Sequence, residues 1–550
     1  MMKYQETIPV LLLGLLMAAG TGFSYLSGNQ HTYLVDGLRL INPELLQYDW
    51  FATQTTHYHD NFGAVLWLID KLMPLSSGTI ALNATLIILS IWTLYQLLKH
   101  CAVKRPLSAL ALLVALMILT RSTSVGYSYV YSNYLQPSSI ASVFFILSLV
   151  WFVKRQYLTS GLFLLVSGVF HTNFLLLGLA TIGLAHLMLG KDDFFKRTAQ
   201  NMVPACLYLV YLLPGLLALS NSEFGEQSRY IYQHIRSPHH YIPMNYLGDF
   251  VKFFGISLLG LASGLLHLTR GSLLKPLVLL FLSMLIIVTI ATTLTTIVFV
   301  PFVSQLFPWR LAPFCELLAL VLMAVTVVSL ADKKLQLTNP TNLLLMAGTV
   351  LVLTYYLEKA RVDYIIAFPV AVIFCAAMAL LMKRPLVAKL QTPSTHNLTI
   401  LGVLVMALIL RLPGAWQRSN VLHDLPAAKQ TLFAWSKTQT AINSQILIPP
   451  GFDDFRLRGE RAVVVDWKSP PILPDEVMVW YQRIADVTGV EKIKSVKQAN
   501  TAYANMDAKR LGTLKSKYKI DYAVFYNRNK RLKGLGKVVF ENDKYLVIGL

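Results

Sequence analysis

Long apolar stretches separated by short polar ones recur along the chain from Pro9 to Arg411. A helix needs roughly 20 apolar residues to cross the core of a bilayer, and no soluble core needs so many such stretches in succession. We therefore predict a polytopic α-helical membrane protein with about thirteen transmembrane helices. The expected segments are 8–26, 78–98, 107–120, 138–153, 158–170, 173–189, 199–219, 250–268, 276–300, 311–330, 342–357, 364–382 and 397–411.

The pattern changes after residue 411. Short β-type runs (ILIPP, AVVVD, DYAVFY, KVVFE and YLVIGL) alternate with the helical stretches PDEVMVWYQRIADVTG and NTAYANMDAKRLGTLKSKY. This order predicts a soluble α/β domain with a parallel or mixed sheet. The chain is thus divided into a transmembrane helical domain at 1–411 and a C-terminal domain at 412–550.

The distribution of basic residues gives the orientation. The formal net charge is +20, and the region from 412 onward holds 22 Lys and Arg against 13 Asp and Glu. Much of the remaining excess lies in six short loops, at 99–105, 154–155, 191–197, 270–275, 333–334 and 383–389. Counting helices puts all six on one side, which the positive-inside rule makes cytoplasmic. The excess therefore reflects topology and not a nucleic-acid site, and the C-terminal domain is predicted to be non-cytoplasmic. The first apolar run is also compatible with a cleaved signal peptide, which would leave the later topology unchanged.

The outer loop at 27–77 contains a second kind of helix. Between Phe51 and Met73, apolar residues recur at helical spacing with polar residues between them. This pattern predicts an amphipathic helix lying along the membrane surface.

The same loop supplies the first candidate for chemistry, Asp49. A carboxylate at the membrane face can act as general base on an acceptor hydroxyl, or it can hold a divalent metal against a phosphate leaving group. The alternative is an acidic side chain that is simply solvated, as for its neighbours Asp36 and Glu44. His57, His59 and Asp60 follow as H-x-H-D, which can bind a metal only if the stretch is extended, since residues i and i+2 of a helix point about 200° apart.

Two further candidates lie at the predicted outer ends of helices. His171 interrupts an apolar run in SGVFHTNFLLLG, where it either takes part in a site or caps a helix junction with Asn173. Arg310, in SQLFPWRLAPFCE, either clamps a lipid phosphate or extends to ordinary headgroups beside Trp309. In the C-terminal domain, charged residues between Asp453 and Lys468 form either a binding crevice or a solvated rim.

With Asp49 on the first outer loop, the arrangement resembles the GT-C superfamily of membrane glycosyltransferases, which use polyprenyl-phosphate-linked sugars. The resemblance lies in LINPELLQYDW followed by a surface helix, VFHTNF at the outer end of a short helix pair, FPWR opening a later helix, and a C-terminal outer α/β domain. The segment FDDFRLRGERAVVVDWKSPPILPDEVMVWYQRI also resembles the tails of uncharacterised bacterial membrane proteins with this layout.

The resemblance implies inverting transfer of a sugar from a polyprenyl-phosphate donor to an acceptor on the outer face of a bacterial inner membrane. Asp49 matches the family's catalytic base or metal ligand, and Arg310 matches a cation that contacts the lipid-linked phosphate. His171, His57 and Asp60 are expected at the edge of the substrate site. Many members have a second acidic residue next to or two positions from the first, whereas Trp50 and Phe51 follow here, so metal dependence stays open.

The competing classes are a transporter or flippase for a lipid-linked or polar substrate, and a non-catalytic assembly protein.

Overall fold

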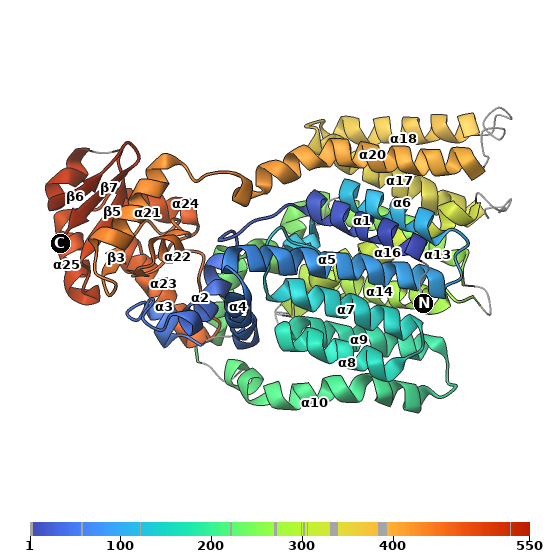
Figure 1. The fold of residues 1–550 in the computed structure, drawn as a ribbon, viewed down its shortest axis with the longest axis horizontal. Helices are drawn as coiled ribbons and strands as arrows, with labels where there is room; N and C mark the ends of the chain where they lie inside the picture. Colours follow the sequence, from blue (N-terminus) through green and yellow to red (C-terminus); the bar gives the residue numbers. More distant parts are fainter. Residues whose placement is uncertain are drawn as a thin grey trace.

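The computed structural model describes residues 4–56, 59–120, 123–220, 223–268, 272–298, 300, 303–304, 306–330, 339–382, 393–528 and 530–550. Each predicted membrane segment overlaps one long helix, and Figure 1 shows these helices running side by side as a bundle. They are α1 (Tyr4–Thr21), α5 (Leu75–His100), α6 (Pro106–Thr120), α7 (Pro137–Val153), α8 (Tyr157–Phe170), α9 (Thr172–Leu189), α10 (Phe194–Ser220), α13 (Leu247–Leu265), α14 (Lys275–Thr296), α16 (Ala312–Leu330), α17 (Asn339–Lys359), α18 (Tyr364–Met382) and α20 (Pro393–Arg418).

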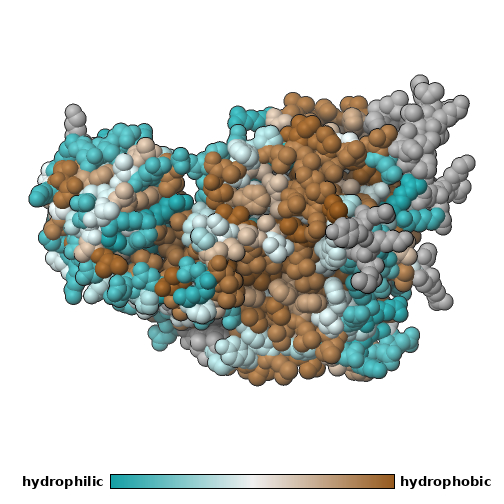
Figure 2. Space-filling model, viewed as in Figure 1, coloured by the Kyte–Doolittle hydropathy of each residue, from teal (hydrophilic) through white to brown (hydrophobic). Residues whose placement is uncertain are grey.

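The surface of the bundle is apolar over most of its length, as Figure 2 shows. Within the described residues, 6 helices are long and apolar enough to cross a membrane. The other predicted spans form helices that are shorter, less apolar or only partly described. The predicted multi-span helical architecture is therefore confirmed.

The described basic loops meet at one end of the bundle. Lys99 pairs with Glu6 at 2.8 Å, which joins the end of α5 to the start of α1. The Cys101 thiol lies 3.8 Å from the carbonyl of Leu273, just before α14. The sheet domain lies at the opposite end (Figure 1), as the predicted orientation requires. The predicted basic residues at 270, 333–334 and 383–389 lie outside the described residues.

Three helices of the first outer loop lie between the bundle and the sheet domain: α2 (Gln30–Ile41), α3 (Trp50–Gln54) and α4 (Asp60–Leu72). The predicted continuous surface helix is wrong at this point, because α3 ends at Gln54 and the backbone is extended at Thr55. Glu476 of the sheet domain accepts hydrogen bonds from both N and Oγ1 of Thr56, which fixes the extended segment.

The second half of the predicted surface helix is present as α4, and it is amphipathic. Leu66 packs so closely on α2 that a Cβ on Gly37 would lie 2.5 Å from its side chain. On the opposite face Trp67 and Leu72 are 44% and 72% exposed, and these side chains suit the lipid–water boundary.

The C-terminal domain is built on a mixed five-stranded sheet with the order β4-β3-β5-β7-β6. Strands β3 (Gln445–Leu447), β4 (Ala462–Val463) and β5 (Tyr522–Tyr526) are parallel, whereas β7 (Tyr545–Gly549) pairs antiparallel with both β5 and β6 (Lys537–Glu541). All five strands occur in the predicted runs, so the predicted mixed α/β fold is confirmed.

Helices α21 (Ala427–Gln439), α22 (Phe455–Gly459), α23 (Pro474–Thr488), α24 (Val496–Ala504) and α25 (Ala508–Tyr518) surround this sheet. The single helix predicted from Asn500 to Tyr518 is divided in two. Asp507 accepts a hydrogen bond from the backbone N–H of Arg510 at 2.8 Å, and this N-cap starts α25 as a separate helix.

Candidate functional site

Two clusters of polar side chains lie where the sheet domain meets the helical bundle. The Asp49 cluster consists of Asp49, Arg456, Asp466 and Ser469. The Arg310 cluster consists of Tyr33, His59, His171, Tyr241 and Arg310.

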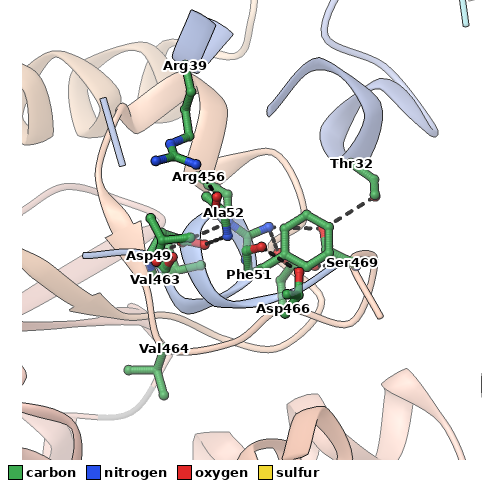
Figure 3. A network of polar contacts seen from close by, with 12 residues as sticks. Thr32, Arg39, Asp49, Phe51, Ala52, Arg456, Val463, Val464, Asp466 and Ser469 are labelled. Carbon is green, nitrogen blue, oxygen red and sulfur yellow. Dashed lines mark hydrogen bonds and ion pairs between the residues drawn. The ribbon is translucent and has the colours of Figure 1, made fainter. Parts of the chain in front are cut away.

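Asp49 is fully buried and serves as the N-cap of α3 (Figure 3). Its Oδ1 accepts the backbone N–H of Ala52 at 3.0 Å. Its Oδ2 accepts Nε of Arg456 at 2.8 Å and the backbone N–H of Val463 at 2.9 Å. Val463 belongs to β4, the edge strand, so Asp49 also satisfies a donor that the edge would otherwise leave unpaired.

Arg456 completes the cluster from the side of the sheet domain. Its Nη1 donates to Asp466 and, at 3.0 Å, to the hydroxyl of Ser469. The guanidinium also lies 5.2 Å from the ring of Phe51, and it is 2% exposed. The cluster therefore fastens the first outer loop to the sheet domain through a buried, hydrogen-bonded set of charges.

This geometry bears on the predicted role of Asp49. An ionised carboxylate has about four acceptor positions, and three donors of the protein already occupy positions on Asp49. None of these contacts involves Arg310, and the carboxylate has no exposed surface. The structure gives Asp49 a docking role, and its catalytic role stays a prediction.

The charged residues between 453 and 468 form neither an open crevice nor a solvated rim. Arg461 donates to the carbonyls of Lys437 and Thr440, both at 2.8 Å. Asp454 pairs with Lys429 at 2.7 Å. Asp453 has a buried Oδ1 without a hydrogen-bond partner in the described structure, and burial raises its pKa to about 7. Most of this set is committed to internal contacts of the sheet domain and its docking surface.

Arg310 is held at the outer end of α16 by a fixed turn. Phe307 adopts a left-handed conformation with φ of 48°, and Pro308 opens the 3₁₀ turn η4 (Pro308–Leu311). The indole N–H of Trp309 donates to Thr292 of α14 at 3.2 Å. The amide of Asn173 donates to the carbonyl of Leu306 at 3.0 Å, so the start of α9 anchors the segment that carries Arg310.

The two histidines of the cluster come from separate elements and lie side by side. His59 precedes α4, and its ring contacts the ring of Tyr33 edge-on with centroids 4.8 Å apart. His171 joins α8 to α9, and its ring centroid lies 5.8 Å from that of His59. Asn61 donates to the carbonyl of Val169 at 3.2 Å, which ties α4 to the end of α8.

Electrostatics keep both histidines neutral. Burial, followed by the charge of Arg310, lowers the pKa of His59 from its ordinary value of 6.5 to about 3. Burial, Arg310 and His59 lower the pKa of His171 well below 6.5. At neutral pH each imidazole therefore keeps one N–H donor and carries no charge.

The guanidinium of Arg310 has no counterion within the described residues. No carboxylate there pairs with it, and its Nε is buried without a hydrogen-bond partner. Its neighbours are the phenol groups of Tyr33, Tyr129 and Tyr241 and the ring of Phe307 at 5.9 Å. Arg310 is half-buried and its buried Nε is unpaired, and a phosphate could accept a pair of hydrogen bonds from this group.

The segment between α10 and α13 lies over this cluster and joins it to the sheet domain. It forms α11 (Gly225–Tyr230), a π-helical turn η2 (Ile231–Arg236), α12 (Pro238–Tyr241) and a 3₁₀ turn η3 (Pro243–Tyr246). Nη2 of Arg236 donates to the carbonyl of Lys468 at 3.0 Å, and the hydroxyl of Tyr232 donates to that of Pro471. His240 contacts the carbonyl of Gly126 at 2.7 Å, in the short hairpin formed by β1 (Thr123–Ser124) and β2 (Ser128–Tyr129).

Beside His59 lies a small crevice whose lining includes the carboxylate of Asp36. It is lined by Thr32, Tyr33, Asp36, Phe51, Thr55, Thr56 and His59. Asp36 projects from α2, a helix that the sequence did not predict. The sequence shows Asp36 as one of two acidic residues that precede Asp49 in this loop. Nothing in the local pattern distinguishes it from the other, Glu44, which is exposed in the structure.

The other predicted site residues have different outcomes. The structure brings His171 and Arg310 into one cluster with His59, whereas Asp49 lies in the other cluster. Asp60 is exposed in the first turn of α4. His57 lies outside the described residues. In the part of the chain that the structure describes, no group of three or more His, Cys, Asp or Glu side chains is arranged to hold a metal ion.

Comparison with solved structures identifies the architecture. The chain aligns with the crystal structure of ArnT from Cupriavidus metallidurans in the apo state, with a TM-score of 0.50 and 13% sequence identity, over 98% of this chain and 96% of ArnT. The chain shares the ArnT fold. ArnT is a GT-C glycosyltransferase. A second ArnT structure, bound to undecaprenyl phosphate, aligns over 98% and 96% of the two chains with a TM-score of 0.45 and 12% identity. The predicted GT-C-like layout is therefore confirmed at the level of the fold.

Sequence comparison adds a match in the C-terminal domain. Residues 427–487 match a family model described as a domain of unknown function, DUF6798. This range contains Arg456, Asp466 and Ser469, the three residues that join Asp49 in its cluster. The search of curated proteins found no match to the sequence.

Proposed function

We propose that the protein is a membrane glycosyltransferase that takes a sugar from a polyprenyl-phosphate donor and transfers it to an acceptor on the non-cytoplasmic side. The observation that carries this proposal is the unpaired guanidinium of Arg310 beside two neutral histidines. Arg310 lies near Tyr241, which belongs to the segment whose Arg236 contacts the sheet domain, and the chain has the ArnT fold.

In the proposed reaction, an acceptor hydroxyl oxygen attacks the anomeric carbon of the donor sugar. The bond between that carbon and the phosphate oxygen breaks, and polyprenyl phosphate leaves with the bonding electron pair. The hydroxyl proton passes to a carboxylate. Negative charge grows on the phosphate as the bond breaks, so a fixed cation beside it stabilises the transition state more than the ground state.

Arg310 meets the requirements of the phosphate partner. Its position is set by the turn at Phe307 and by the anchor from Asn173, so little reorganisation is needed when an anion binds. The neutral rings of His59 and His171 add no further positive charge beside the bound anion. The apolar surface of the bundle suits contact with a polyprenyl chain in the lipid.

Two carboxylates of the first outer loop are candidates for the base. Asp36 lines the crevice that contains Tyr33 and His59, next to the proposed phosphate position. Asp49 was the prediction from sequence, and it would have to give up its contacts with Arg456 and Val463 to reach a substrate. Because Asp36 lines this crevice whereas Asp49 has no exposed surface, we take Asp36 as the proton acceptor and Asp49 as the competing assignment.

The test compares Asp36→Asn with Asp49→Asn in full-length protein reconstituted in lipid nanodiscs. Sugar transfer from a radiolabelled undecaprenyl-phosphate donor is measured together with thermal unfolding. We expect Asp36→Asn to abolish transfer while the protein remains folded at the assay temperature. We expect Asp49→Asn to lower the unfolding temperature. Full transfer activity in Asp36→Asn would remove this residue from the mechanism, and loss of transfer in a fully stable Asp49→Asn would return the role to Asp49.

The transporter alternative gains no support from the one charged pair inside the bundle that the structure describes. Lys252 of α13 lies 3.4 Å from Glu316 of α16, and both are almost fully buried. Lys252 also donates to the carbonyl of Thr123, and Ser124 donates to Glu316 at 2.6 Å. All these partners brace the β1–β2 hairpin against two helices, so the pair forms a closed support and not an open polar path.

A further inference from the structure

A second polar cavity lies on the sheet domain, at the amino-terminal ends of strands β3 and β5. This groove has a volume of about 520 Å³. It is bounded by the loop before β3, by the end of α25 with the turn that follows it, and by the first outer loop. The residues that matter for its chemistry are Tyr48, Asn443, Tyr518, Lys519, Asp521 and Tyr522.

The floor of the groove is fixed by backbone contacts between its two loops. The carboxylate of Asp521 accepts the N–H of Gln445 at 2.8 Å, and the N–H of Asp521 donates to the carbonyl of Gln445 at 3.0 Å. Lys519 ends α25 in a left-handed conformation with φ of 51°, which turns the chain back towards the sheet. The groove is therefore preformed by the sheet and needs no ligand to shape it.

Several polar groups of the groove are available to a ligand. Asn443, Lys519 and Asp521 are exposed. In the described structure no hydrogen bond occupies the side-chain amide of Asn443 or the ammonium of Lys519, and no cation pairs with Asp521. An amide, a carboxylate and an ammonium together offer both donors and acceptors, with one positive and one negative charge.

Three tyrosines flank these polar groups. Tyr48, from the first outer loop, is 59% exposed. Tyr522 is half-buried, with its ring edge-on to Trp435 at a centroid distance of 5.5 Å. Tyr518 is held from behind by Arg483, whose guanidinium lies 4.9 Å from the Tyr518 ring and 4.6 Å from the ring of Trp50. The rings of Tyr518 and Tyr522 are thus supported at fixed positions, and all three tyrosines combine an apolar face with a hydroxyl.

This combination matches the surface of a neutral sugar. A pyranose ring has an apolar face of C–H groups, which packs against an aromatic surface. It also has a rim of hydroxyls, which need hydrogen-bond donors and acceptors. We propose that the groove binds a neutral oligosaccharide, and that this glycan belongs to the acceptor. The binding of saccharide follows from the groove alone, whereas its assignment to the acceptor rests on the proposed function.

The position of Tyr48 links the groove to the rest of the outer face. Tyr48 directly precedes Asp49, so the same loop that docks the sheet domain also closes one side of the groove. A glycan held there lies on the sheet domain, outside the Arg310 cluster. The groove would therefore hold the distal part of a long acceptor and leave its reactive end free to reach the membrane surface.

Binding is tested with full-length protein in nanodiscs, titrated with maltohexaose, cellohexaose and mannohexaose and followed by saturation-transfer NMR. We expect at least one of these probes to bind. We expect Tyr48→Ala and Asn443→Ala each to weaken that binding at least tenfold with unchanged unfolding temperatures. Tyr211→Ala, which removes an exposed tyrosine from α10, is the matched control and should bind as the parent does. Absence of binding by all three sugars, or equal binding by all variants, overturns the proposal.

The acceptor assignment needs a separate measurement. Transfer is assayed at increasing acceptor concentration with the parent protein and with Asn443→Ala. We expect the KM for acceptor to rise at least tenfold while kcat is retained, since Asn443 does not touch the reacting atoms. An unchanged KM in a protein that transfers sugar overturns the acceptor role alone. If the parent protein transfers no sugar from any donor but still binds the oligosaccharide in the groove, the proposed function fails and the binding site stands.

Discussion

The Asp49 and Arg310 clusters both lie where the sheet domain meets the bundle, but they differ in how their charged groups are paired. In the Asp49 cluster a buried arginine meets two carboxylates, and the Asp49 carboxylate meets three donors. In the Arg310 cluster the guanidinium meets aromatic rings and neutral imidazoles, with no carboxylate among the described residues. A saturated charge network holds parts of a protein together, whereas an unsaturated one is completed by a ligand. We therefore call the first cluster a joint, and we propose that the second is a site.

The largest expected effect is the loss of stability when a substitution disrupts the Asp49 cluster. Arg456→Met leaves Asp49 and Asp466 buried without their cation, and removing one partner of a buried pair costs about 3–5 kcal/mol. We expect a lower unfolding temperature and faster proteolysis between the bundle and the sheet domain. Lys437→Met is the control, because the Lys437–Glu460 pair is exposed and such pairs contribute at most about 1 kcal/mol. Equal stability of both variants would contradict the docking role.

The next effect concerns the site. Arg310→Gln removes the cation but keeps a polar side chain of similar length, and it leaves no carboxylate behind. We expect transfer to fall by about 10²–10³-fold, the usual cost of losing one electrostatic stabiliser of a transition state, with little change in unfolding temperature. Arg528→Gln, on the exposed surface of the sheet domain, is the matched control. Transfer at the parent rate in Arg310→Gln would exclude the proposed phosphate partner.

The two clusters also differ in how far the sequence could predict them. Hydrophobic periodicity locates the membrane helices and the strands because burial against lipid or a core imposes it locally. The same pattern singled out His171 and Arg310 as candidates, because ionisable residues stand out at the ends of apolar segments. The pairing of Asp49 with Arg456 joins residues that are 407 positions apart, and no local pattern encodes that contact. The break at Thr55 depends likewise on Glu476, which comes from another domain.

A smaller effect concerns pH. The pKa of His59 is lowered to about 3 in the folded protein, so below pH 6.5 the unfolded chain binds a proton that the folded one does not. His59 therefore costs no stability above pH 6.5, and the penalty grows as the pH falls, reaching about 1.4 kcal/mol at pH 5.5. Unfolding temperatures measured from pH 7.5 to pH 5 should fall less steeply in His59→Gln than in the parent protein. Parallel curves would show that His59 is not held neutral by its surroundings.

The smallest effect tests how firmly the site is held. Asn173→Ala removes the hydrogen bond to the carbonyl of Leu306 and should cost about 1 kcal/mol. Because that bond anchors the segment before Arg310, we expect donor affinity to fall several-fold as well. Isothermal titration with undecaprenyl phosphate measures the second effect. Loss of stability without any change in donor affinity would show that the Arg310 segment keeps its position without this anchor.

The most direct test of the central claim is the position of the donor phosphate in a cryo-electron microscopy map of the full-length protein with undecaprenyl phosphate. The account predicts phosphate density within about 3 Å of the Arg310 guanidinium, where charge-assisted hydrogen bonds form, with the Asp49–Arg456 contact intact. Phosphate density bound to Arg456, with Asp49 released from its contacts, would contradict the division between joint and site.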